Sequence, residues 1–146
     1  SNNDINEETK KFLYDITNGS PGLINEYEFD EILNIFDRLI NLIEDKDPFS
    51  ESNNDTIKFL SSLDNDQLNI FLSFIKFILI TINKIKLGIN ITKNYLSDSV
   101  LKIQTISDKI SIDIIQRKLD YLINNENDLF TFNLDKKIFM INFISE

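Results

Sequence analysis

The sequence predicts an all-α fold: a single helical domain over residues 1–146, in which five or six helices form a bundle around an apolar central helix from about Leu68 to Leu87. Along most of the chain, apolar residues recur three or four positions apart, which is the spacing of one helix face. The chain has 3 Gly and 2 Pro, too few for a series of short strands and turns. Asp or Asn precedes several apolar runs, where a short polar side chain can cap a helix.

The first two helices are predicted from their caps. After a flexible polar start at residues 1–4, Asp4 is placed to cap a helix that extends to residue 17, and the segment NGSPG at residues 18–22 interrupts the chain. Asn25 then precedes a second apolar run, and Glu28 completes a capping box three residues later. Pro48 cannot continue this second helix, which is therefore expected to end before it.

The second helix is amphipathic. Its apolar face is formed by Phe29, Ile32, Leu33, Phe36, Leu39, Ile40 and Ile43. Its opposite, polar face is formed by Asp30, Asn34, Asp37, Asn41 and Glu44. The first face is expected in the core and the second in water.

A short helix over residues 52–63 is followed by the central helix, for which Asp64 is the predicted cap with Gln67 at the box position. The segment after Asp64 is apolar enough to suggest a membrane span. However, its polar residues fall on one narrow stripe, and Lys76 would cost about 2.5–3.5 kcal/mol at a bilayer centre. The unbroken apolar run is also shorter than the ~20 residues that a span needs. The stretch is therefore predicted to be a core helix, ended by Gly88.

The last third of the chain is less uniform. A helical pattern covers residues 91–124, and the segment ISDKIS around Ser107 is expected to bend or split it. NNEND, residues 124–128, is predicted to be a loop. Residues 129–146 fit either a strand hairpin that turns at residues 135–137 or a helix, and we favour a helix that docks on the bundle. The core is expected to include Phe36, Leu39, Phe71, Phe74, Ile75, Ile78, Ile82 and Ile106.

Composition excludes several classes of function. The chain has no Cys and no His, which removes thiolate chemistry, Cys/His zinc sites and the commonest general base. No Gly-rich phosphate loop is present. The net charge of -9 disfavours binding to nucleic acid or to anionic lipid. We therefore expect no catalytic activity, no metal and no cofactor.

Two acidic segments superficially suggest metal binding. Glu26, Glu28, Asp30 and Glu31 point in different directions on a helix, and an acidic first turn compensates the helix dipole. Residues 44–56 lack the Gly and the terminal Glu that a calcium-binding EF-hand loop needs at fixed positions. Both segments are expected to be structural.

The chain resembles in composition the helical surface lipoproteins of Lyme and relapsing-fever spirochaetes, for example in the segments FLSSLDNDQLNIFLSFIKFI and SDKISIDIIQRKLDYLINN. A Cys-free domain that opens with the polar segment SNNDINEE is also similar to those proteins after removal of the lipidated Cys. The resemblance covers the whole chain and rests on composition rather than on a motif. It implies an extracellular domain, tethered to the membrane by a lipid anchor upstream, that binds a host protein.

A second resemblance is to the poxviral Bcl-type regulators, which also wrap amphipathic helices around an apolar central helix. The Asn-Trp-Gly-Arg signature of their cellular relatives is missing here, since the chain has no Trp and Ile89 follows Gly88. This resemblance implies a location in the host cytoplasm and a hydrophobic groove that binds a partner's amphipathic helix.

The leading functional hypothesis is thus a non-catalytic binding domain at the cell surface, with a host protein as partner. The candidate binding residues are exposed polar positions of the second helix: Asp30, Asn34, Asp37 and Asn41. The alternative, a groove-bearing regulator, requires several large apolar side chains to be uncovered in the free protein. An acidic inhibitor that mimics nucleic acid is a third hypothesis, based on net charge alone.

Overall fold

The computed structural model describes residues 29–89 and 97–146, with the side chains of 29 and 97–100 excepted. This part of the chain contains six helices and no strand, so the all-α prediction is confirmed. They are α3 (Phe29–Glu44), α4 (Glu51–Ser61), α5 (Asn65–Lys86), α6 (Ser97–Ser107), α7 (Ile112–Thr131) and α8 (Lys136–Ser145). The predicted helix at residues 4–17, the cap at Asn25 and the flexible polar start at residues 1–4 lie outside the described residues.

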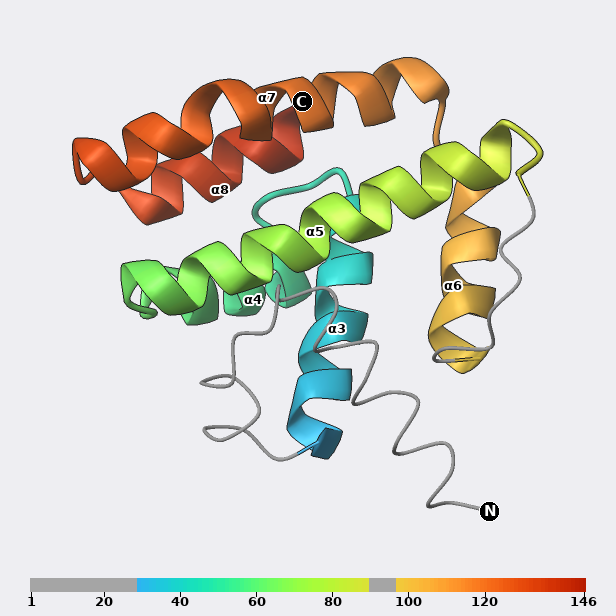
Figure 1. Cartoon of the computed structure of the whole chain (residues 1–146). Helices are drawn as coiled ribbons and strands as arrows, with labels where there is room; N and C mark the ends of the chain where they lie inside the picture. Colours follow the sequence, from blue (N-terminus) through green and yellow to red (C-terminus); the bar gives the residue numbers. More distant parts are fainter. Residues whose placement is uncertain (1–28, 90–96) are drawn as a thin grey trace.

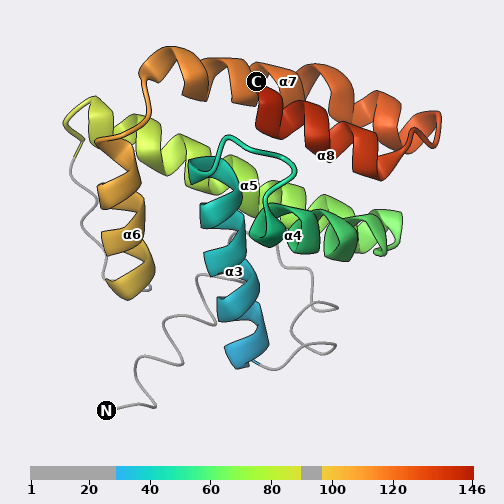
Figure 2. The ribbon, with the colours of Figure 1, turned by 180° about the vertical axis from the view of Figure 1, so that it is seen from behind.

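The helix α5 is the centre of the bundle. It contacts α3, α4, α6 and α7, while α7 and α8 pair as an antiparallel hairpin along one side of it (Figure 1). On the other side, α3 approaches α5 steeply and lies between α4 and α6, as the reverse view shows (Figure 2). By length and composition α5 also qualifies as a membrane span, a test that core helices pass as well. Nine of its side chains are buried: Leu68, Phe71, Leu72, Phe74, Ile75, Ile78, Leu79, Thr81 and Ile82.

One hydrophobic core joins all six helices. Phe36 of α3 and Phe71 of α5 both pack edge-on against Phe74, with ring centroids 6.0 and 5.7 Å apart. Phe59 extends this aromatic row to α4. All eight core residues predicted from the sequence are buried. Leu42, which falls beside the predicted apolar face of α3, is buried too.

The helix boundaries follow local hydrogen bonds. The Asp64 carboxylate accepts from the Gln67 amide at 2.8 Å, so the predicted start of α5 is confirmed. Ser50, Ser111 and Asp135 cap α4, α7 and α8 in the same way. After α5, Gly88 takes a positive φ of 77° and lets the chain leave the helix, as expected for an achiral residue.

Two predictions about the last third need correction or completion. The segment 124–128 is helical, not a loop, because Glu126 forms an ion pair with Lys76 of α5 and Leu129 is buried one turn later. The expected break near Ser107 is real and separates α6 from α7.

The favoured helix at the C-terminal end is confirmed as α8, and residues 135–137 are not a hairpin turn. Asp135 instead accepts from the Ile138 amide at 3.0 Å and begins the helix. The chain reverses between α7 and α8 at Asn133, whose φ is 49°, a conformation that Asn tolerates better than most residues.

Candidate functional site

The four candidate residues share one face of α3, since they follow each other at helical steps of four, three and four residues. Asp30, Asn34 and Asn41 are exposed. Asp37 is half-buried, and its carboxylate lies 2.9 Å from the Lys102 ammonium of α6. The structure thus leaves three of the four side chains facing water, while Asp37 forms a surface ion pair with Lys102 of α6.

A hollow of about 270 Å³ lies on the α4 side of this face. Ile35 and the half-buried ring of Phe59 supply its apolar surface, while Asn34 and Arg38 supply polar groups. Asn34 therefore borders a concave, partly apolar surface.

A second hollow, of about 290 Å³, lies on the α6 side. Asn41 lines it together with Leu101, whose side chain is 60% exposed, and with Ile40 beneath. Lys109 forms an ion pair with Glu44 at 3.1 Å near its edge. Exposed pairs of this kind contribute at most about 1 kcal/mol each, so the charges here can be rearranged by a partner at little cost.

The sequence did not reveal Phe59 or Leu101 as neighbours of the candidate residues. Both come from helices that are distant in sequence, and each looks like an ordinary apolar position of its own helix. Only the crossing of α3 between α4 and α6 places them beside Asn34 and Asn41.

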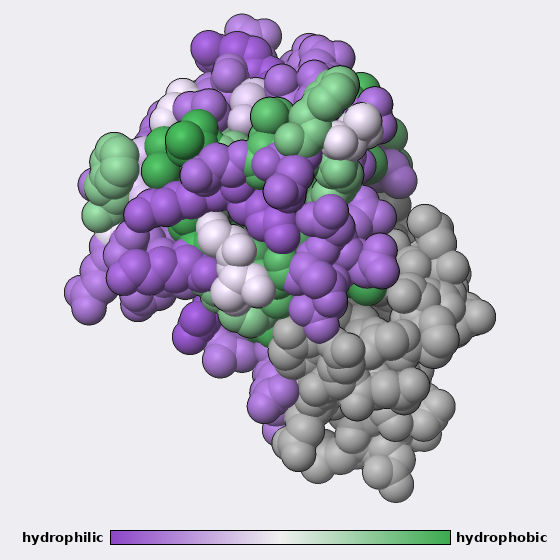
Figure 3. Space-filling view, turned by 90° about the vertical axis from the view of Figure 1, so that its left-hand side faces the viewer, coloured by the Kyte–Doolittle hydropathy of each residue, from purple (hydrophilic) through white to green (hydrophobic). Residues whose placement is uncertain are grey.

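Large apolar side chains are also exposed elsewhere. One group lies at the turn between α7 and α8, where Phe132 is 69% and Ile138 is 56% exposed, with Leu134 between them in sequence. Figure 3 views this end of the molecule and shows green apolar surface interrupted by purple polar groups. Other exposed apolar residues of the described part are spread over the α3–α4 connection, α5, the segment after it, α6 and α7: Phe49, Ile80, Leu87, Ile89, Leu101, Ile112 and Ile123.

Within the described residues, no three acidic side chains are close enough together to hold a metal ion. In the segment that superficially suggested a calcium loop, Asp45 accepts hydrogen bonds from the Ser50 hydroxyl at 2.6 Å and from the Asp47 amide at 3.0 Å. These bonds hold the pKa of the Asp45 carboxyl below its ordinary value. The buried amide of Asn53 also donates to the carbonyls of Asp45 and Asp47, so this loop is held by its own hydrogen bonds. Glu26 and Glu28 of the acidic cluster lie outside the described residues.

Comparison with known proteins adds no functional information: the chain matches no protein-family profile, no curated protein and no solved structure.

Proposed function

We propose that this chain is a non-catalytic helical domain, displayed on a cell surface, that binds a host protein through the outer face of α3. The observation that carries the proposal is the position of the exposed Asn34 and Asn41 beside two hollows with apolar walls. We call this surface the α3 face and define it by Asp30, Asn34, Asn41 and the two hollows. The compositional similarity to spirochaetal surface lipoproteins supports the location.

The α3 face has the mixed character of a non-obligate interface. Such interfaces are about as apolar as the remaining surface, and they gain specificity from a few buried anchors within a polar rim. The hollows beside Phe59 and Leu101 offer space for apolar side chains of a partner. Asn34 and Asn41 offer both hydrogen-bond donors and acceptors next to that space.

The chemistry of the chain supports binding rather than catalysis. The whole sequence lacks His and Cys, which supply most general bases and thiol nucleophiles. At the α3 face the ionisable groups are Asp, Glu, Lys and Arg, and Asp37–Lys102 and Glu44–Lys109 form ordinary surface ion pairs. These groups recognise a partner well and are poorly arranged to activate a nucleophile.

The proposal is tested by capture from host serum and from host cell lysate with three proteins. They are the wild type, the α3-face variant Asn34→Arg/Asn41→Arg, and a control variant, Gln116→Arg/Asn124→Arg, which adds the same charges on the exposed side of α7. We expect the wild type and the control to capture the same serum protein. The α3-face variant should bind it at least tenfold more weakly, because the long arginines fill both hollows.

Equal capture by the α3-face variant and the control would refute the α3 face as the binding surface. Capture of a single partner from lysate alone would instead favour the groove-bearing regulator. The observation that favours this second candidate is the apolar group Phe132, Leu134 and Ile138. In that case, the variant Phe132→Ser/Ile138→Ser should lose the lysate partner while the α3-face variant keeps it.

A further inference from the structure

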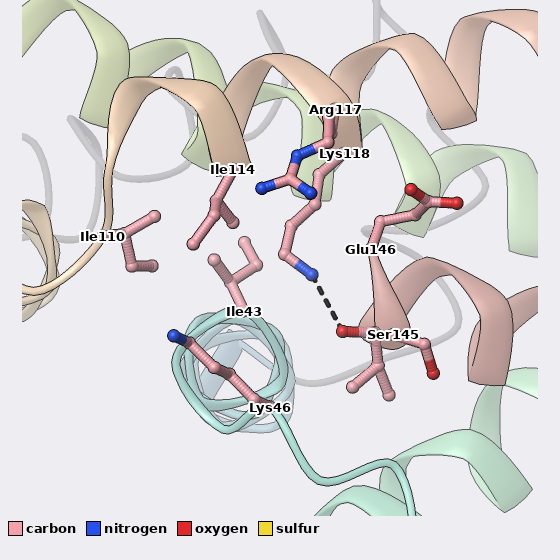
Figure 4. Close-up of a pocket in the computed structure, with 9 residues that line it drawn as sticks. Ile43, Lys46, Ile110, Ile114, Arg117, Lys118, Ser145 and Glu146 are labelled. Carbon is pink, nitrogen blue, oxygen red and sulfur yellow. Dashed lines mark hydrogen bonds between the residues drawn. The ribbon is translucent and has the colours of Figure 1, made fainter.

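A third hollow, of about 190 Å³, lies where the end of α3, the first half of α7 and the end of α8 meet. Its walls are formed by four isoleucines, Ile43, Ile110, Ile114 and Ile144. Figure 4 shows Ile43, Ile110 and Ile114 on one side and the end of α8 on the other, with the Lys118 side chain reaching down between them.

Among the described residues, Lys118 is a buried cation without an ion-pair partner. Its side chain is 2% exposed, and its ammonium donates to the carbonyls of Phe143 and Ile144 at 3.1 and 3.0 Å. The ring of Phe143 adds a contact at 5.0 Å. These partners are neutral, and no carboxylate of the described residues lies within 4 Å of the ammonium. An ammonium has three N–H bonds and the described residues accept two of them, so one is open to a ligand.

Two further cations border the same hollow. Arg117 and Lys46 are exposed at its rim. In Figure 4 the Arg117 guanidinium lies above the Lys118 ammonium. Glu146 is the acidic residue of the lining and lies across the hollow from Ile110 (Figure 4). Three cationic side chains and one acidic side chain thus line one place in a chain whose net charge is -9. This local excess of positive charge favours an anion.

We propose that this hollow binds a small organic anion, namely a carboxylate that carries a compact apolar group. The carboxylate is held by Lys118 and Arg117, since a guanidinium can donate two parallel hydrogen bonds to it. The apolar group packs against the isoleucines. A cavity of about 150 Å³ accommodates benzene, so the space suits a molecule of about the size of benzoate. This site is separate from the proposed protein-binding face.

The structural alternative is that Lys118 serves only to cap the last carbonyls of α8, as cationic side chains often do at helix ends. That role needs neither Arg117 nor Lys46, which make no contact with those carbonyls among the hydrogen bonds described. It also predicts no preference for carboxylates over neutral molecules of the same shape. Binding experiments distinguish the two accounts.

The test is a titration of the full chain with benzoate at low ionic strength, followed by ¹H–¹⁵N and methyl chemical shifts. We expect saturable shifts at Ile43, Ile110, Ile114 and Ile144, with a dissociation constant on the order of 1 mM or tighter for so small a ligand. Benzamide, the neutral isostere, should bind at least tenfold more weakly. The absence of saturable shifts at these isoleucines, or equal binding of benzamide, would overturn the proposal.

Variants localise the effect. Lys118→Met should abolish benzoate binding, but it also removes the cap of α8, so the exposed Arg117→Gln and Lys46→Gln are the decisive changes. Each should weaken benzoate binding at least threefold without lowering the unfolding midpoint, since each removes a positive charge that disfavours the buried Lys118 ammonium. Lys137→Gln, an exposed lysine at the far end of α8, is the matched control and should bind benzoate like the wild type. If Arg117→Gln and Lys46→Gln bind as tightly as Lys137→Gln, the site is not where we place it.

Discussion

At the scale of single residues, two isoleucines of the same helix contribute very differently to stability. Ile78 of α5 is fully buried, whereas Ile80, two positions later, is 44% exposed within the polar stripe of that helix. Removing buried carbons loses their transfer free energy and leaves a cavity, while an exposed side chain loses little on truncation.

We therefore expect Ile78→Ala to lower the free energy of unfolding by about 2–5 kcal/mol. Ile80→Ala should lower it by less than about 1 kcal/mol, although the same atoms are removed. Urea unfolding followed by far-UV circular dichroism measures both. Equal losses would mean that α5 does not pack as described.

Burial of the Lys118 ammonium costs stability. Desolvation lowers the pKa of its ammonium from 10.5 to about 8, while Glu146 opposes this shift and Lys46 and Arg117 add to it. Between these two values the unfolded chain binds more protons than the folded chain, so the stability contributed by this position rises with pH. Below pH 8 the lysine is charged in both states and the cost of burying it is fully present.

The free energy of unfolding of the wild type minus that of Lys118→Met should thus rise by about 2 kcal/mol between pH 7 and pH 9.5. The comparison cancels the titration of other groups. Burial also raises the pKa of Tyr121, so the stability contributed by that residue falls as the pH rises above 10. Measurements that stop at pH 9.5 avoid this second titration. A pH-independent difference between the two proteins would contradict this account of Lys118.

Sequence patterns identified the main core residues and missed the buried polar ones. The eight predicted core residues occupy helical positions that periodicity identifies. Lys118 and Asn53 are buried as well, but a lysine or an asparagine in a helix predicts an exposed position. What permits their burial is a set of backbone carbonyls on other segments, up to 26 residues away for Lys118.

At the scale of elements, helix ends divide into those set locally and those set by tertiary contacts. The Asp64 carboxylate accepts from the backbone amide of Gln67, only three residues later, so its role as a cap could be predicted. Three lysines instead donate to carbonyls near the end of another helix, which no local pattern reveals. They are Lys86 to Ser107, Lys118 to Phe143 and Ile144, and Lys136 to Leu63.

The length of α7 shows the same division. The run NNEND is polar enough to predict a loop, because Asn and Asp favour turns. The helix continues through it because Glu126 pairs with Lys76 of α5, and the Asn125 side chain donates within the helix to the Tyr121 carbonyl at 2.8 Å. One of these contacts comes from a residue 50 positions earlier. A tertiary contact thus overrides the local preference.

At the scale of the whole molecule, the candidate site was half predictable. Spacing alone puts Asp30, Asn34, Asp37 and Asn41 on one face of α3. The hollows beside that face, and the ion pair that occupies Asp37, depend on where α4 and α6 cross α3. Crossing geometry follows from how side chains of all six helices pack, and a single sequence does not reveal it.

The shared core also determines how the molecule should unfold. The row of Phe36, Phe74, Phe71 and Phe59 joins α3, α5 and α4, whereas Tyr121 packs against Phe139 and Phe143 within the α7–α8 hairpin. Buried residues of both groups belong to one continuous core. We therefore predict that the hairpin does not unfold separately from the helices around α5.

The chain has four tyrosines and no Trp, so the triple variant Tyr14→Phe/Tyr27→Phe/Tyr95→Phe leaves Tyr121 as its only tyrosine. In this variant, the near-ultraviolet signal of Tyr121 and the far-UV helix signal should give the same urea midpoint and slope, as a two-state transition requires. The far-UV midpoint of the wild type should match, which establishes that the three substitutions are neutral. If Tyr121 changes at a lower urea concentration than the helix signal, the α7–α8 hairpin is a separate unit and the six helices do not share one cooperative core.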